Sequence, residues 1–167
     1  AAARLPVSDG RREVWKAIAR GTLREDGGAW LVEEFQNAAL QDVRDDIAAG
    51  IARAGNGGGR GVGGSTPEEK AKRMAEARER FRIVYRGTSE MDVRRRLTRG
   101  ALFGLGCVRL TSRDEDHGAD AAAFFRGIAT LEPDEVMRGR LERVAQVFEG
   151  EGFRGSDQFD RIMAGKD

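Results

Sequence analysis

The chain contains very little cysteine and histidine. Cys107 and His117 are the single residues of their kinds among 167. One cysteine cannot form an internal disulfide, and the two side chains together provide too few ligands for a tetrahedral zinc site. The apolar neighbours of Cys107 also disfavour the thiolate that a nucleophile requires. We therefore expect no disulfide, no bound metal, no cofactor and no cysteine nucleophile.

Long apolar runs and an excess of one charge sign are also absent. No run approaches the ~20 residues that a membrane-spanning helix needs, so we expect a protein that does not cross a membrane. The 29 basic and 28 acidic residues leave a formal net charge of +1, far from the strong positive field of a typical nucleic-acid-binding protein. We therefore expect other proteins as partners and no nucleic acid, with association at a membrane surface left open.

Proline is scarce, at three residues, whereas many of the 23 glycines lie in one place. Residues 54–65 read AGNGGGRGVGGS, and seven of them are glycine. Such a run loses much backbone entropy on ordering and has no side chains to anchor a core, so it is typical of a linker. It divides the chain into an N-terminal helical part, 1–53, and a C-terminal helical part, 66–167.

Apolar residues at helical spacing dominate the N-terminal part. A helix is expected from about Asp9 to Arg20, where Val14 and Ile18 lie one turn apart. A second helix, ~37 Å long at 1.5 Å per residue, is expected over 29–53. Apolar residues recur there every four positions: Leu31, Phe35, Ala39, Val43, Ile47 and Ile51. Its opposite face, expected to be solvated, carries mostly acidic residues: Glu33, Glu34, Asp42, Arg44, Asp45 and Asp46.

The clearest helix start in the chain is Thr66-Pro67-Glu68-Glu69. Threonine suits the cap, proline suits the first helical position, and the glutamate three residues after the cap completes a capping box. This helix is expected to run to about Arg86. The β-forming residues FRIVY leave a strand over 81–86 as an alternative. A further helix is expected from Ser89 to Gly100.

Residues 101–111, ALFGLGCVRLT, form the most apolar stretch of the chain. Its glycines favour a buried turn, a short strand over 107–111, or a loop that docks on a partner. Three more helices are expected over 119–131, 133–150 and 156–164. Together these patterns predict a mostly all-α protein with six or seven helices in a bundle-like array and no internal repeat.

One group of short motifs resembles the mono-ADP-ribosyltransferase pattern. It consists of Tyr85-Arg86-Gly87-Thr88-Ser89, Thr111-Ser112 and Phe124-Phe125. The resemblance implies paired strands over 81–86 and 107–111, with Arg86 orienting the NAD phosphates and Ser112 shaping the nicotinamide pocket. The chain departs from the family at Glu132 and Glu135, which lie at a helix start instead of forming a Glu-x-Glu motif after a strand. An NAD-using enzyme of this kind is the alternative function.

No group of residues in the sequence combines a nucleophile, a base and an orienting partner, so we predict no catalytic residue. We expect a non-enzymatic accessory or extrinsic subunit of a larger assembly that acts by protein–protein docking. Ala1 is compatible with a chain whose targeting segment has been removed, which points to a thylakoid or mitochondrial complex, and equally with an artificial boundary. The expected docking surface combines apolar and basic residues: Phe103, Leu105, Val108, Leu110, Arg94, Arg95 and Arg96.

Overall fold

The computed structural model describes residues 9–25, 28–54, 66–105 and 115–166. Every regular element in these ranges is helical, which confirms the expected mostly α-helical class. In chain order the elements are α1 (Asp9–Glu25), α2 (Ala29–Asn37), α3 (Gln41–Ala54), α4 (Pro67–Gly87), α5 (Met91–Gly104), α6 (Glu115–Ala129), α7 (Glu135–Gln146), a π-helical segment η1 (Val147–Glu151) and α8 (Ser156–Met163). No helix in this part of the chain is long and apolar enough to cross a membrane.

The prediction of a single long helix over 29–53 is wrong, because the structure has two helices there. The chain leaves α2 at Ala38, whose ψ of 118° is extended, and enters α3 at Gln41. The carbonyl oxygen of Ala38, freed by this break, accepts a hydrogen bond from Nε of Arg44 at 2.9 Å. The break allows α3 to fold back and pack against both α1 and α2. An unbroken helix would have buried less of its apolar face.

The helix starting at Thr66 is confirmed, together with its capping box. The backbone N–H of Glu69 donates to the Thr66 hydroxyl at 3.2 Å, and the Glu69 carboxylate accepts from the Thr66 N–H at 3.0 Å. Residues 81–86 continue this helix, so the alternative of a strand there is wrong. The strand suggested for 107–111 and most of the glycine-rich run lie outside the described residues.

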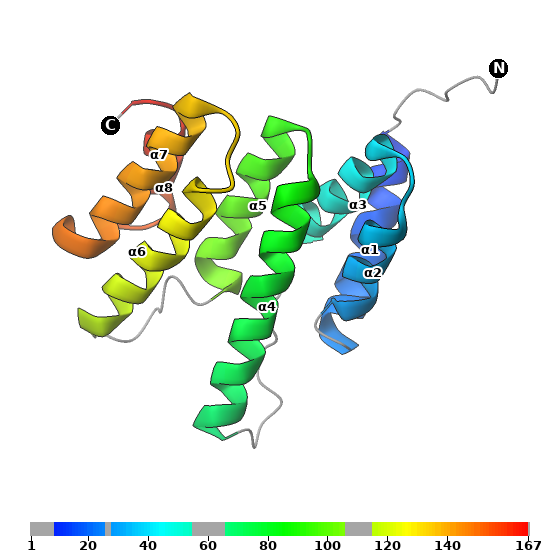
Figure 1. Cartoon of the computed structure of the whole chain (residues 1–167), viewed down its shortest axis with the longest axis horizontal. Helices are drawn as coiled ribbons and strands as arrows, with labels where there is room; N and C mark the ends of the chain where they lie inside the picture. The colour runs from blue at the N-terminus through cyan, green and yellow to red at the C-terminus, as the bar shows by residue number, and fades with distance from the viewer. Residues whose placement is uncertain (1–8, 26–27, 55–65, 106–114, 167) are drawn as a thin grey trace.

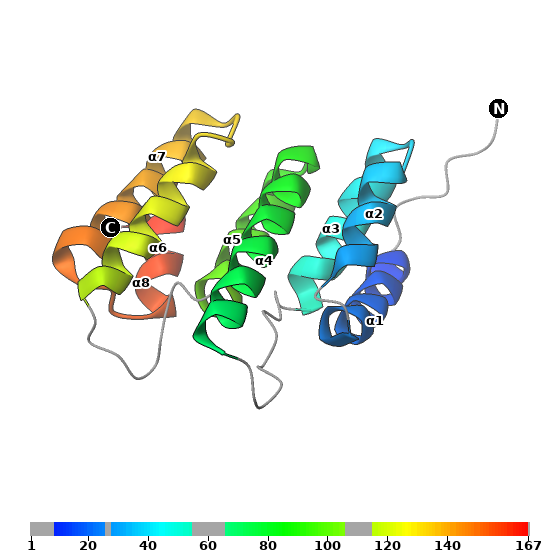
Figure 2. The ribbon, with the colours of Figure 1, turned by 60° about the horizontal axis from the view of Figure 1, so that its bottom comes forward.

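The helices form a row of pairs. Figure 2 shows α2 with α3, α4 with α5 and α6 with α7, each pair standing beside the next. Helix α1 packs against α3 at one end of the row, and α8 packs against α7 and α5 at the other (Figure 1). Helix α3 also packs against α5, so the helices on the two sides of the glycine-rich run are in direct contact.

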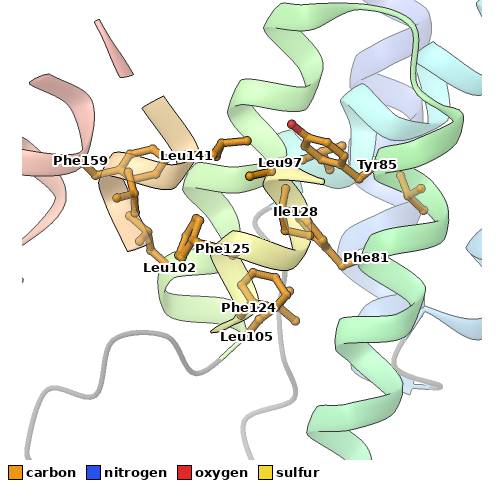
Figure 3. Packing of buried hydrophobic residues seen from close by; sticks show 14 of the residues in the cluster. Phe81, Tyr85, Leu97, Leu102, Leu105, Phe124, Phe125, Ile128, Leu141 and Phe159 are labelled. Carbon is orange, nitrogen blue, oxygen red and sulfur yellow. The ribbon is translucent and has the colours of Figure 1, made fainter. Parts of the chain in front are cut away.

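Aromatic side chains hold the second half of the row together (Figure 3). Phe81 of α4 lies 5.6 Å from Phe124 of α6, measured between ring centroids. Phe125 of α6 lies 6.2 Å from Phe159 of α8 and stacks on Phe148 of η1 at 5.7 Å. The core is therefore continuous from α4 to α8, and a Phe-to-Ala change within it would cost about 3–5 kcal/mol.

The packing of α1 on α3 depends on Gly50. A Cβ atom placed there would lie 2.4 Å from the Cβ of Trp15 in α1 and 2.7 Å from the Trp15 carbonyl carbon. Real Cβ atoms do not approach other atoms this closely, so α1 would have to move away. Gly139 in α7 is a matched contrast, because a Cβ there would meet nothing within 4 Å.

We predict that Gly50→Ala lowers the free energy of unfolding by about 1–3 kcal/mol, because the added methyl group forces two packed helices apart. Gly139→Ala should instead raise it by roughly 0.5–1 kcal/mol, since alanine loses less backbone entropy in a helix. Urea denaturation of both variants would measure the difference. Equal effects of the two substitutions would contradict the close approach of α1 and α3.

Candidate functional site

Polar contacts from α1, α3 and α5 converge on the turn between α4 and α5. Here the hydroxyl of Thr88 donates to the carbonyl of Val84 at 2.6 Å and closes the end of α4. Gln41 of α3 donates from Nε2 to the carbonyl of Gly87 at 2.8 Å. Gly87 itself allows a close approach, because a Cβ there would lie 2.6 Å from the ring of Phe35. We refer to the polar contacts that converge on residues 87–90 as the turn network.

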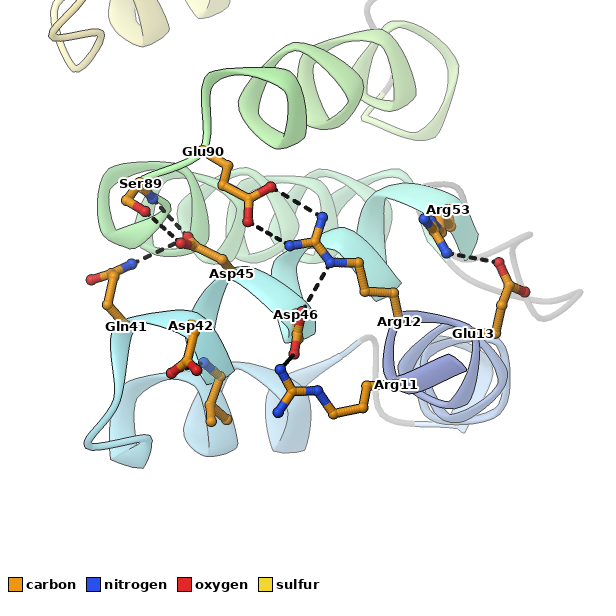
Figure 4. A network of polar contacts seen from close by, with 11 residues as sticks. Arg11, Arg12, Glu13, Gln41, Asp42, Asp45, Asp46, Arg53, Ser89 and Glu90 are labelled. Atoms are coloured by element: carbon orange, nitrogen blue, oxygen red, sulfur yellow. Dashed lines mark hydrogen bonds and ion pairs between the residues drawn. The ribbon is translucent and has the colours of Figure 1, made fainter. Parts of the chain in front are cut away.

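The N-terminal helices contact this turn through Asp45 of α3. Its carboxylate accepts hydrogen bonds from the backbone N–H of Ser89, at 2.7 Å, and from the Ser89 hydroxyl (Figure 4). The amide of Gln41 adds a further contact to the same carboxylate at 3.2 Å. An ionised carboxylate removed from water requires such donors, and here the donors come mainly from the turn.

Arg12 of α1 forms the second contact between the N-terminal helices and the turn. Its Nη1 and Nη2 atoms donate to the carboxylate of Glu90 at 3.0 and 2.5 Å, and its Nε donates to Asp46 at 2.9 Å. Arg11 also pairs with Asp46, at 3.0 Å (Figure 4). The hydrogen bond to Glu90, reinforced by Asp46, raises the pKa of Arg12 above its usual value. This guanidinium is therefore charged at neutral pH.

Asp45 and Asp46 require a correction to the expectation from the sequence. Both were expected on a solvated outer face, but they are only 3% and 1% exposed. The break between α2 and α3 directs this part of the chain toward α1 and the α4–α5 turn. There the carboxylates bind Arg11, Arg12 and Ser89. Burial of a carboxylate is tolerated when it is paired and hydrogen-bonded, as both are here.

Arg94 holds the other side of the turn. Its Nη1 donates to the carbonyl oxygens of Thr88 at 3.0 Å and Ser89 at 2.8 Å. Its Nε and Nη2 donate to the two carboxylate oxygens of Glu132, both at 2.9 Å. The same side chain therefore fastens the α4–α5 turn to the α6–α7 turn through a bidentate ion pair.

The carboxylate of Glu132 is buried and accepts hydrogen bonds from three residues. Besides Arg94, they are the hydroxyl of Tyr85 and the backbone N–H of Asp134, the latter at 2.9 Å. Burial alone would raise the pKa of Glu132, but the hydrogen bonds from Arg94 and Tyr85 outweigh it, and the pKa is lowered. Burial and the contact with Glu132 raise the pKa of Tyr85. The pair consequently consists of an ionised carboxylate and a neutral phenol at neutral pH.

The two sides of the network meet at Ser89. Its hydroxyl and N–H bind Asp45, and its carbonyl binds Arg94. Contacts therefore run without a break from α1 and α3, through the α4–α5 turn, to the α6–α7 turn. The charged groups along this path form ion pairs with one another, and these pairs hold the helices in fixed relative positions.

The structure places the residues predicted for docking in different environments. Arg94 and Leu105 are buried within the chain. Arg95 and Arg96 are exposed on α5. Phe103 belongs to α5, but its side chain is not among those described, and Val108 and Leu110 lie outside the described residues.

The residues of the ADP-ribosyltransferase-like pattern are not assembled as that pattern requires. Residues 81–86 are helical, so the strand that would carry Arg86 is absent. The Arg86 side chain is exposed, whereas the Glu132 carboxylate is enclosed by Arg94 and Tyr85. Ser112 lies outside the described residues.

Comparison with known proteins adds no relative. Neither protein-family models, nor curated proteins, nor solved structures give a match to the chain. Among the described residues, no three or more His, Cys, Asp or Glu side chains are grouped so that they could hold a metal ion. The functional argument therefore rests on the geometry of the chain itself.

We predict that Arg94→Met destabilises the protein by about 3–5 kcal/mol, because it leaves the buried Glu132 carboxylate without its counter-charge. The double variant Arg94→Met/Glu132→Gln should lose less free energy of unfolding than Arg94→Met. Its glutamine keeps an acceptor for Tyr85 without burying a charge. Urea denaturation at pH 7 measures both. A cost below about 1 kcal/mol for Arg94→Met would show that the pair is not held in a water-free site.

The lowered pKa of Glu132 predicts an acid-sensitive contribution to stability. This contribution is fully present above the unfolded-state pKa, near 4.5, and is lost as the pH falls through the lower folded-state value. The free energy of unfolding should therefore fall less steeply between pH 5 and pH 3 in Glu132→Gln than in the wild type. Glu142→Gln, at an exposed position, serves as the control and should keep the wild-type slope. Identical slopes for all three proteins would contradict the assignment.

Proposed function

We propose that this protein is a non-enzymatic accessory subunit that docks on other proteins through the edge formed by its interhelical turns. The α2–α3, α4–α5 and α6–α7 turns follow one another along one side of the row in Figure 2. Contacts between neighbouring turns support this order: Gln41 reaches the carbonyl of Gly87, and Arg94 reaches Glu132. We call this side the turn edge.

The observation that carries the proposal is an exposed apolar side chain at each turn. Leu40, Met91 and Val136 lie at or next to the start of the second helix of each pair, and they are 60%, 50% and 61% exposed. Apolar side chains held at fixed positions on a rigid edge suit a protein interface, because little order has to be gained on binding. The turn network beneath them supplies that rigidity.

The stacked arrangement of helix pairs supports the same proposal. Proteins built from stacked helix pairs commonly present extended surfaces to other proteins. Among the described residues, Glu132 and Tyr85 carry groups capable of acid–base chemistry, and they are bound to each other and to Arg94 beneath the surface. Their placement favours a structural use over a catalytic one.

Site-specific photo-crosslinking tests the proposal. Benzoylphenylalanine would replace Leu40, Met91 or Val136 in the full chain, expressed in its source cells. All three positions should form adducts with the same partner, whereas position Glu142, exposed on α7, should not. A monomer without adducts at any turn-edge position would refute docking, and saturable NAD binding that is lost in Arg86→Ala would favour the enzymatic alternative. An organellar location stays a prediction that this experiment reports on through the identity of the partner.

A further inference from the structure

We infer that the exposed face of α5 binds an acidic segment of the partner protein, an inference that rests on the docking function proposed above. The face consists of Met91, Arg95, Arg96 and Arg99, which we call the α5 face. It begins with Met91 at the turn edge and extends along α5, which belongs to the middle pair of the row. At 1.5 Å per residue, its four side chains span about 12 Å, slightly more than two helical turns.

Helical geometry separates this face from the buried side of α5. Val93, Leu97 and Ala101 point into the core, and Arg94 lies on the same buried side, toward Glu132. With 100° between successive residues, Arg95 and Arg96 fall on the opposite side, and both are exposed. Two neighbouring arginines of one sequence run therefore face solvent, while the third is enclosed.

Arg95 and Arg96 have no ion pair within the described part of the chain. Asp92 lies one turn away on the same helix, yet neither arginine is paired with it. Arg99, at the end of the face, binds Asp160 of α8 at 2.9 and 3.1 Å. Within the described residues, the α5 face thus presents two guanidinium groups without an ion pair next to an exposed methionine.

This combination fits a carboxylate-bearing protein segment. A guanidinium group binds a carboxylate through two parallel hydrogen bonds, and Arg12 with Glu90 and Arg94 with Glu132 show this geometry within the chain. Arginine and methionine are also enriched at protein interfaces. Two free arginines and a net charge of +1 supply too few phosphate contacts for strong binding of nucleic acid at physiological salt.

Fluorescence anisotropy on the full chain tests the inference directly. The probe is a fluorescein-labelled helical peptide of glutamate, leucine and alanine, with a lysine-for-glutamate peptide as its counterpart. The acidic peptide should bind, the basic one should not, and the double variant R95E/R96E should weaken binding at least about tenfold. The control R154E/R161E makes the same charge change at two other exposed arginines and should weaken it less than twofold.

Each other outcome overturns the inference. Equal losses in the two double variants would mean that only the total charge matters. Tighter binding to labelled duplex DNA, or to vesicles containing phosphatidylserine, would mean that the arginines select phosphate and not a protein carboxylate. Absence of binding by the acidic peptide would leave the α5 face as a solvated surface.

Crosslinking separates this inference from the proposed function. If R95E/R96E forms the Val136 adduct in undiminished yield, docking at the turn edge stands and the role of the α5 face is refuted. If no turn-edge position forms an adduct in the wild type, the proposed function fails. The expected result is a partner adduct whose yield falls in R95E/R96E and is kept in R154E/R161E.

Discussion

The bidentate pair between Arg94 and Glu132 is the interaction on which the rest of the structure depends. Both side chains are buried, and neither would tolerate burial without the other, because an unpaired charge in the interior costs several kcal/mol. The Nη1 atom of Arg94, which does not bind Glu132, donates to the carbonyl oxygens of Thr88 and Ser89. The arginine of the pair therefore also fixes the α4–α5 turn. That turn can then offer Ser89 to Asp45 and Glu90 to Arg12, which attaches the N-terminal helices.

This dependence explains how one stretch of arginines serves two purposes. Arg94 is buried and connects α5 with the α4–α5 turn and the α6–α7 turn. Arg95 and Arg96 face solvent on the other side of the same helix. The rigid turn also determines where Met91 projects. The proposed docking surface is therefore a direct product of the buried network, and damage to the network should displace the surface even where no surface residue is changed.

The features that the sequence predicted well are those decided within one or two helical turns. The capping box at Thr66 and Glu69 depends on local hydrogen bonds and backbone angles, and it is present. The helix expected to begin with Pro133 at its first position instead begins at Glu135, with Asp134 as its cap. Apolar spacing failed at Ala39, which continues the four-residue pattern but lies between the end of α2 and the start of α3. Periodicity reports which side chains could share a face, and it does not report whether the chain stays helical between them.

The burial of Asp45 and Asp46 could not be read from the sequence for a related reason. An aspartate in a charged stretch is usually solvated, and these two become buried only because Arg11, Arg12 and Ser89 are brought to them from outside α3. The helical class, the helix start at Thr66 and the small net charge follow from composition and short-range pattern alone. Tertiary packing decided which charges distant in sequence form pairs. It thereby also decided which face of α5 is buried and which is exposed, because a charge is tolerated in the interior only where a partner is present.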